Sequence, residues 1–156
     1  MPRHPYKKKI LRPDALHKSF EVAKLINYVM FDGKKSVAEK VVYEVLEELK
    51  KEEEPVKVLH KAIANVAPTY EVKPRRLGGA SYLVPTEVRR ERKLYLALNW
   101  IIEAARSRSQ KEYRTFKAKL LAELQDAAKN QGQAVAKRQQ AEKLAEANKA
   151  FAHLRW

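Results

Sequence analysis

The chain has 156 residues, and its 33 lysines and arginines against 19 acidic residues leave a net charge of +14 at pH 7. Such a charge repels itself in a compact fold, so we expect a polyanionic partner, with nucleic acid ahead of an anionic membrane surface. The chain has no cysteine, which excludes disulfides and thiolate metal sites, and no apolar run approaches the roughly 18 residues that span a bilayer.

The first 13 residues hold five basic residues, three prolines and no acid. This composition buries little apolar surface, so we expect residues 1–13 to form a basic, extended N-terminal arm. The arm also lacks the apolar core of a signal peptide. The absence of cysteine favours a cytosolic or organellar interior. The remaining residues, 14–156, suit one domain.

Apolar residues recur at helical spacing over 22–30, and Gly33 follows as the expected C-cap of this first helix. Ser36 and Glu39 stand three apart and predict a capping box at the start of a second helix. That helix is expected to end in the charged stretch "KKEEE". Two helices joined by a short basic turn are therefore expected.

Pro55 is favoured in the first turn of a third helix, which Pro68 stops. The apolar period then changes to two over about 70–89, which is typical of strands. Gly78 and Gly79 interrupt this segment and predict a hairpin turn. The residues expected on one side of the second strand are Tyr82, Val84 and Val88.

Helical spacing returns near Glu91 and continues in two further stripes. The fifth helix is expected to bury Tyr113, Phe116, Leu120 and Leu124, and the last to bury Ala141, Leu144, Ala145, Asn148 and Phe151. The predicted fold is all-α, with about six helices and a protruding two-stranded β-hairpin between helices three and four.

Catalytic and metal-binding patterns are weak in this sequence. The four histidines share no metal-ligand spacing. The stretch "DGKK" at 32–35 lacks the glycine that a phosphate-binding P-loop requires five residues earlier, where Tyr28 stands. We therefore expect no enzyme, no cofactor and no metal.

The hairpin segment, residues 73–93, carries seven lysines or arginines. Arg75 and Arg76 precede the glycine pair, and the stretch from Arg89 to Lys93 follows the second strand, so positive charge lies on both legs. Like charges on paired strands repel, and an edge strand protected against aggregation needs only one or two lysines. Arginine also suits phosphate oxygens and stacks on bases. The segment is therefore interpreted as a nucleic-acid contact.

Basic residues are spread over the arm, the "GKK" turn, the hairpin and two later segments, a distribution that suits a folded RNA held from several sides. A duplex-DNA-binding transcription regulator, which would insert one helix in the major groove, is the alternative, and a membrane-surface protein is the third reading. The candidate RNA-binding residues are Arg3, Lys7, Lys8, Lys9, Arg12, Lys34, Lys35, Arg75, Arg76, Gly78, Gly79, Arg89, Arg90, Arg92, Lys93, Arg108, Arg114, Lys137 and Arg138.

Three blocks, "KLINYVMFDGKKSVAEKVVYEV", "VKPRRLGGASYLVPTEV" and "LAEANKAFAHLRW", resemble those of small ribosomal subunit protein seven in its bacterial and organellar form. The similarity is collinear over about 13–156. It implies a structural constituent of the small subunit that binds the 3′ major domain of its rRNA and nucleates assembly of the head. The implied location is the cytoplasm, or an organellar matrix or stroma, with no membrane partner.

The same resemblance implies a position near the exit-site tRNA and the mRNA exit path, beside neighbouring proteins of the head and platform. The hairpin tip, Gly79, Ala80, Ser81 and Tyr82, is then expected closest to the tRNA. Some positions depart from the family pattern. Asn99 stands in place of an arginine, Ala136 in place of a basic residue, Leu154 in place of an aromatic residue and Val45 in place of a small one.

Overall fold

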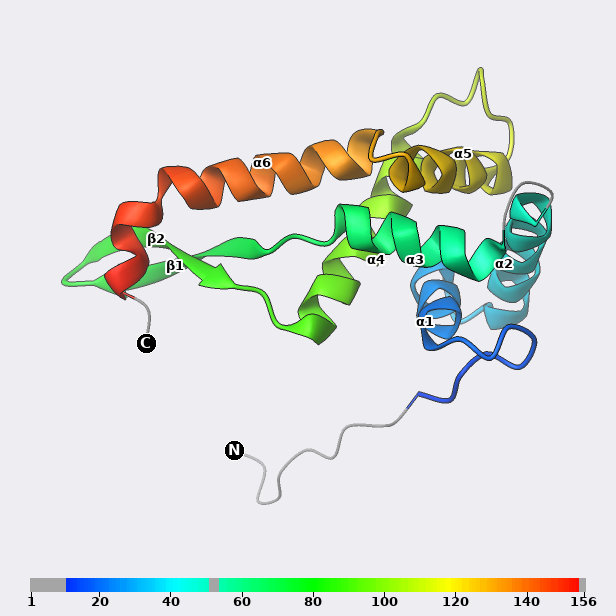
Figure 1. Ribbon diagram of the computed structural model, residues 1–156, viewed down its shortest axis with the longest axis horizontal. Helices are drawn as coiled ribbons and strands as arrows, with labels where there is room; N and C mark the ends of the chain where they lie inside the picture. Colours follow the sequence, from blue (N-terminus) through cyan, green and yellow to red (C-terminus); the bar gives the residue numbers. More distant parts are fainter. Residues whose placement is uncertain (1–10, 51–53, 155–156) are drawn as a thin grey trace.

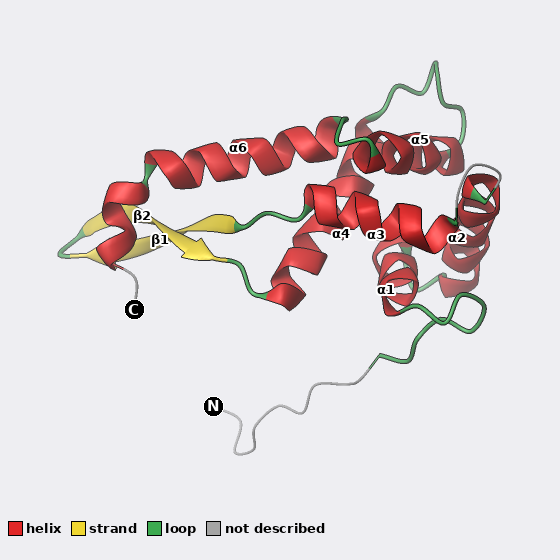
Figure 2. Ribbon diagram, viewed as in Figure 1, coloured by secondary structure: helices red, strands yellow, loops and turns green. Residues whose placement is uncertain are grey.

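The computed structural model describes residues 11–50 and 54–154, so the predicted arm residues Arg3, Lys7, Lys8 and Lys9 lie outside it. Its described part confirms the predicted fold class, with one two-stranded β-hairpin between the third and fourth helices of the chain (Figures 1 and 2). The elements are α1 (Phe20–Val29), α2 (Lys35–Leu49), α3 (Pro55–Val66), β1 (Tyr70–Leu77), β2 (Ala80–Glu87), α4 (Arg90–Ser107), α5 (Phe116–Ala128), α6 (Gln133–Ala147) and the short 3-10 helix η1 (Lys149–Leu154).

The molecule has a helical bundle at one end and an extension at the other. Helices α1 to α5 form the bundle, while the hairpin and α6 project from it side by side (Figure 1). Helix η1 turns back onto the hairpin at the far end of α6, where the rings of Phe151 and Tyr82 lie 5.4 Å apart. The hairpin is therefore braced along its length and does not project alone.

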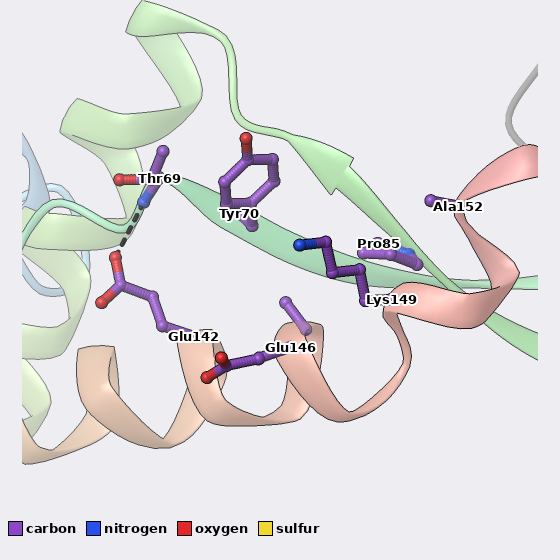
Figure 3. Close-up of a pocket in the computed structure, with 8 residues that line it drawn as sticks. Thr69, Tyr70, Pro85, Glu142, Glu146, Lys149 and Ala152 are labelled. Carbon is purple, nitrogen blue, oxygen red and sulfur yellow. Dashed lines mark hydrogen bonds between the residues drawn. The ribbon is translucent and has the colours of Figure 1, made fainter.

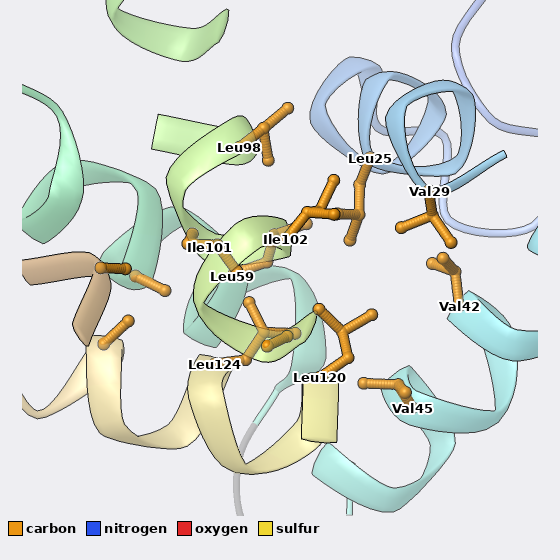
Figure 4. Packing of buried hydrophobic residues seen from close by; sticks show 14 of the residues in the cluster. Leu25, Val29, Val42, Val45, Leu59, Leu98, Ile101, Ile102, Leu120 and Leu124 are labelled. Atoms are coloured by element: carbon orange, nitrogen blue, oxygen red, sulfur yellow. The ribbon is translucent and has the colours of Figure 1, made fainter. Parts of the chain in front are cut away.

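The bundle is held together by aliphatic side chains that meet between the helices (Figure 4). Leu25 of α1, Leu59 of α3, Ile101 of α4, and Leu120 and Leu124 of α5 are all fully buried. Burying one such side chain stabilises a fold by about 1.5–3 kcal/mol relative to leaving it exposed. The bundle is thus a rigid base from which the hairpin and the turns present their charges.

The predicted helix ends around the "GKK" turn are wrong. Helix α2 begins at Lys35 with Lys34 in the N-cap position and no side-chain cap, so the capping box of Ser36 and Glu39 does not form. Helix α1 ends at Val29, and Gly33 lies beyond it in a turn with φ +74°. This left-handed turn feeds the chain into α2 before Ser36, which leaves that serine inside the first helical turn.

The stripe predicted for the last helix is also only partly right. Ala145 is buried, but Leu144 is 49% exposed, and the α-helix ends at Ala147, before Phe151. The physical reason is that α6 leaves the bundle after its first turns and then lies against the narrow hairpin. A partner of that width covers less of the helix than a bundle would.

Asp14 fixes the chain just before α1. The hydroxyl of Tyr43 on α2 donates to its Oδ1 at 2.6 Å, and the amides of Leu16 and His17 donate to its Oδ2 at 3.1 and 3.0 Å. Burial raises the pKa of Asp14, but these hydrogen bonds outweigh it and hold that pKa below its ordinary value. The same contact raises the pKa of Tyr43 to about 12.

We expect Tyr43→Phe to lower the free energy of unfolding by about 1–2 kcal/mol at pH 7, because the variant loses a hydrogen bond to a charged acceptor. A carboxyl whose pKa is depressed on folding stabilises above its unfolded pKa and loses that effect as pH falls through the folded pKa. The difference between wild type and variant should therefore shrink below about pH 4. Urea unfolding from pH 7 to pH 2 measures this, with Tyr70→Phe as the control; a difference that does not change with pH would contradict it.

Candidate nucleic-acid interface

The hairpin tip is a two-residue turn. Leu77 pairs with Ala80, and between them Gly78 and Gly79 have φ values of +55° and +89°, which side-chain-bearing residues rarely adopt. An added Cβ at either glycine would meet nothing within 4 Å. The glycines are therefore required by the backbone, and the space beside them is open to an approaching ligand.

The two hairpin arginines do not form one pair. Arg75 lies opposite Tyr82, and Arg76 lies opposite Ser81. Directly opposite residues share a face and successive residues alternate, so Arg75 lies on the face of Tyr82 and η1, and Arg76 on the other. Arg76 is exposed, whereas Arg75 and Tyr82 are half-buried. The tip residues Gly79, Ala80 and Ser81 are exposed.

Three basic residues lie together where the hairpin meets α4. Arg89, Arg90 and Lys93 line one shallow cleft of about 440 Å³ with Glu87 and Val88. Arg89 and Arg90 are exposed, and Lys93 is half-buried. The structure therefore brings together three residues that the sequence places within five positions, beside an open hollow.

Arg92 is held by two neighbours. Its Nε lies 3.2 Å from Oε2 of Glu71 on β1, and its guanidinium lies 5.0 Å from the ring centre of Tyr95. Half of the side chain remains exposed. Arg92 therefore links the base of the hairpin to α4 and still has donors for a ligand.

The "GKK" turn presents its lysines on the bundle. Lys34 and Lys35 are both exposed. The Nζ of Lys35 lies 3.5 Å from Oε1 of Glu39, one helical turn away. An exposed pair of this kind contributes only about 0.3–0.5 kcal/mol, so it leaves Lys35 available to a phosphate.

The other candidate residues differ in their surroundings. Arg12 and Arg114 are exposed. Lys137 forms an exposed ion pair with Glu103, with 2.6 Å between Nζ and Oε2. Arg138 is mostly buried and donates from Nη1 to the carbonyl of Asn65 at 2.7 Å, which joins α6 to α3.

Arg108 lies in an internal network. Its Nε and Nη2 donate to Oε2 of the fully buried Glu123 at 2.8 and 2.6 Å, Nη2 also contacts Asp126, and Nη1 donates to the Tyr113 hydroxyl at 3.3 Å. Burial lowers the pKa of Arg108, but its bonds to the two carboxylates outweigh burial and raise it. Only 14% of its side chain is exposed. Its contacts are internal, and we leave it out of the interface.

The cleft between the base of the hairpin and α6 has a different chemistry (Figure 3). Thr69, Tyr70 and Pro85 face Glu142 and Glu146 across about 560 Å³, with Lys149 and two alanines completing the lining. Oε1 of Glu142 accepts from the Thr69 amide at 3.1 Å, which ties α6 to the start of β1. Two carboxylates against one lysine disfavour phosphate, so this cleft is not part of the interface.

A further group of aromatic and basic residues was not predicted from the sequence. The Nζ of Lys24 lies 5.5 Å from the ring centre of Phe20 and 5.9 Å from that of Tyr28 on α1. The Tyr28 ring stands edge-on to that of Tyr95 on α4, at 5.7 Å. We call Phe20, Lys24, Tyr28, Tyr95 and Arg92 the aromatic–cation row. The spacing of Phe20, Lys24 and Tyr28, four residues apart, is a signal that could have revealed its first half.

Neither a metal cluster nor a membrane span is found over residues 11–50 and 54–154. No group of three or more histidine or acidic side chains is arranged to hold a metal ion there. No helix in the same ranges is long and apolar enough to cross a bilayer.

Comparison with known proteins decides the family. The model of the family "Ribosomal protein S7p/S5e" matches residues 1–149. The chain belongs to this family. Proteins named "Small ribosomal subunit protein uS7" are 50% identical in Caldicellulosiruptor bescii and 51% in a Sulfurihydrogenibium species, each over the whole of both chains. One from Maricaulis maris is 49% identical over 99% of this chain and 98% of its own.

Membership confirms the resemblance drawn from the three sequence blocks. It makes the chain a structural ribosomal protein of the small subunit, with a part in translation, and not an enzyme. The family departures can now be placed in the structure. Val45 is buried in the core, Asn99 is half-buried and Ala136 is exposed. Neither Asn99 nor Ala136 can give a phosphate the cation expected at its position.

Proposed function

We propose that this protein binds the 3′ major domain of small-subunit rRNA and nucleates assembly of the subunit head. In this proposal it works in the ribosome of the cytoplasm, or of an organelle if the host is eukaryotic. It lies near the exit-site tRNA and the mRNA exit path, beside other proteins of the head and platform. Membership of the family supports a place in the small subunit, and the distribution of positive charge supports RNA as the ligand.

The observation that carries the proposal is the separation of the exposed cations on one rigid fold. Lys34 and Lys35 lie at the start of α2, Arg76 lies on the hairpin, and Arg89 and Arg90 lie at the start of α4. A ligand that meets all of them must itself be folded and anionic, which describes rRNA better than a straight duplex. Each cation releases counterions from the RNA when it binds a phosphate.

The proposed rRNA contacts are the candidates found in the sequence, without Arg108. They are Arg3, Lys7, Lys8, Lys9, Arg12, Lys34, Lys35, Arg75, Arg76, Gly78, Gly79, Arg89, Arg90, Arg92, Lys93, Arg114, Lys137 and Arg138. The residues proposed nearest to tRNA and mRNA are Gly79, Ala80, Ser81 and Tyr82. Because Tyr82 contacts Phe151, we expect it to orient the tip, while the three exposed residues before it approach the ligand.

A competition experiment tests the proposal. A folded fragment of the 3′ major domain should displace labelled RNA from the protein at physiological salt, and an operator-length DNA duplex should compete far less well. The protein should also travel with small subunits on a sucrose gradient of cell extract. Equal competition by the DNA duplex, as the transcription-regulator reading requires, would overturn the proposal.

A further inference from the structure

Helices α1 and α4 together present a row of rings and cations, of which only Arg92 was among the RNA contacts predicted from the sequence. Lys24 lies between the rings of Phe20 and Tyr28, and Arg92 lies over the ring of Tyr95. Tyr28 and Tyr95 close the row across the two helices by an edge-on contact of 5.7 Å. The five side chains therefore form one continuous surface feature made by two elements.

The rings at the two ends of the row are accessible to solvent, unlike the side chains of a core cluster. Phe20 is 41% exposed and Tyr95 is 37% exposed, while Tyr28 between them packs against the core. The row thus has a fixed centre and two accessible ends. Over residues 11–50 and 54–154 no ion pair joins Lys24 to a carboxylate, and its Nζ lies over the rings of Phe20 and Tyr28.

The row is continuous with the proposed rRNA contacts. Arg92 is itself one of them, and its bond to Glu71 joins the row to the base of the hairpin. On the other side, Phe20 borders a cleft of about 380 Å³ that Arg90 and Lys93 line together with Glu21 and Glu91. The two carboxylates offset the two cations in that cleft, so Arg92 is the link between the row and the proposed rRNA contacts.

We propose that the aromatic–cation row binds unpaired bases of the RNA by stacking, with Phe20 and Tyr95 as the stacking residues and Lys24 and Arg92 as the cations beside them. This inference rests on the proposed function, because it needs RNA at this face. Sequence-tolerant binding of single strands combines aromatic platforms with nearby positive charge. Bases in a duplex keep their faces covered by their neighbours, so the row selects unpaired segments.

The test uses the full chain, a folded fragment of the 3′ major domain and a short oligoribonucleotide that carries 2-aminopurine. The variants are Phe20→Leu and Tyr95→Leu, which keep an apolar side chain and remove the ring, singly and together. Each single variant should bind the rRNA fragment about fivefold or more weakly. Tyr95→Phe should bind like wild type, and so should Leu144→Ala, which removes an exposed apolar side chain of α6.

Three further readouts separate stacking from a structural role. The slope of log affinity against log salt should be unchanged, because neither leucine variant removes a charge. The 2-aminopurine signal of the single-stranded oligoribonucleotide should respond to wild type and less to the double variant. The same oligoribonucleotide annealed to its complement should bind both proteins equally. Thermal midpoints close to wild type are expected for all variants.

Several outcomes would overturn the inference. They are affinity of the double variant within twofold of wild type, an equal loss on duplex RNA, or Tyr95→Phe as weak as Tyr95→Leu. Normal binding to naked RNA with failure to enter the subunit would assign the row to a protein partner instead. A shallow salt slope for wild type itself would sink the proposed function, whereas a steep slope with unaffected leucine variants would sink only the stacking role.

Discussion

Arg108→Ala should lower the free energy of unfolding by about 3 kcal/mol or more, because it leaves the fully buried carboxylate of Glu123 without its charge partner. Oε1 of the same carboxylate accepts from the Ala134 amide at 3.0 Å, at the start of α6. The pair therefore joins the end of α4 to both α5 and α6. Chemical denaturation of the two proteins at pH 7 measures the effect.

Arg114→Ala is the matched control. Arg114 lies in the same α4–α5 loop with an exposed side chain, so its truncation should change stability by no more than about 0.5 kcal/mol. Near-equal stabilities for the two variants, with rRNA affinity lost only for Arg108→Ala, would reverse our assignment of Arg108 as an internal residue.

The second large effect is on the salt dependence of RNA binding. Changing Arg76, Arg89 and Arg90 together to alanine should reduce the slope of log affinity against log salt by about 2 to 3, at about 0.7 to 0.9 for each lost phosphate contact. Because these side chains are exposed, the thermal midpoint should stay close to that of wild type. Titration of the rRNA fragment at four salt concentrations gives the slope.

A variant with three other exposed cations replaced, Lys50, Lys61 and Lys143, controls for the loss of net charge. It changes the protein's charge by the same amount but touches none of the proposed contacts, so its slope should fall much less. Equal slopes for the two triple variants would mean that the interface has no preferred place on this molecule.

The sequence was sufficient for the elements whose signals are local. Helical spacing located α1 to α5, although Tyr113, predicted in the stripe of the fifth helix, lies in the loop before α5 begins at Phe116. The two glycines located the hairpin turn, because left-handed backbone at Gly78 and Gly79 requires residues without a Cβ. Caps were less predictable. The capping box of Ser36 and Glu39 failed, whereas Ser19 and Thr115, which were not singled out, accept from Val22 and Ala118 at the starts of α1 and α5.

The candidate site was harder to predict because a charge pattern does not show which cations are already paired. Arg108 and Arg76 look alike in the sequence, yet one contacts Glu123 across the bundle and the other faces solvent. The contact of Tyr28 with Tyr95 likewise joins residues far apart in the chain, so helical spacing reveals only one side of the aromatic–cation row. Tertiary packing decided both cases.

An experimental structure of the small subunit containing this chain tests the central claim most directly. Our account predicts rRNA phosphates within hydrogen-bonding distance of Lys34 or Lys35 and of the arginines at the hairpin and the start of α4, all in one particle. The contrary result would be a particle in which the hairpin and the lysine turn both face solvent, with no phosphate near either.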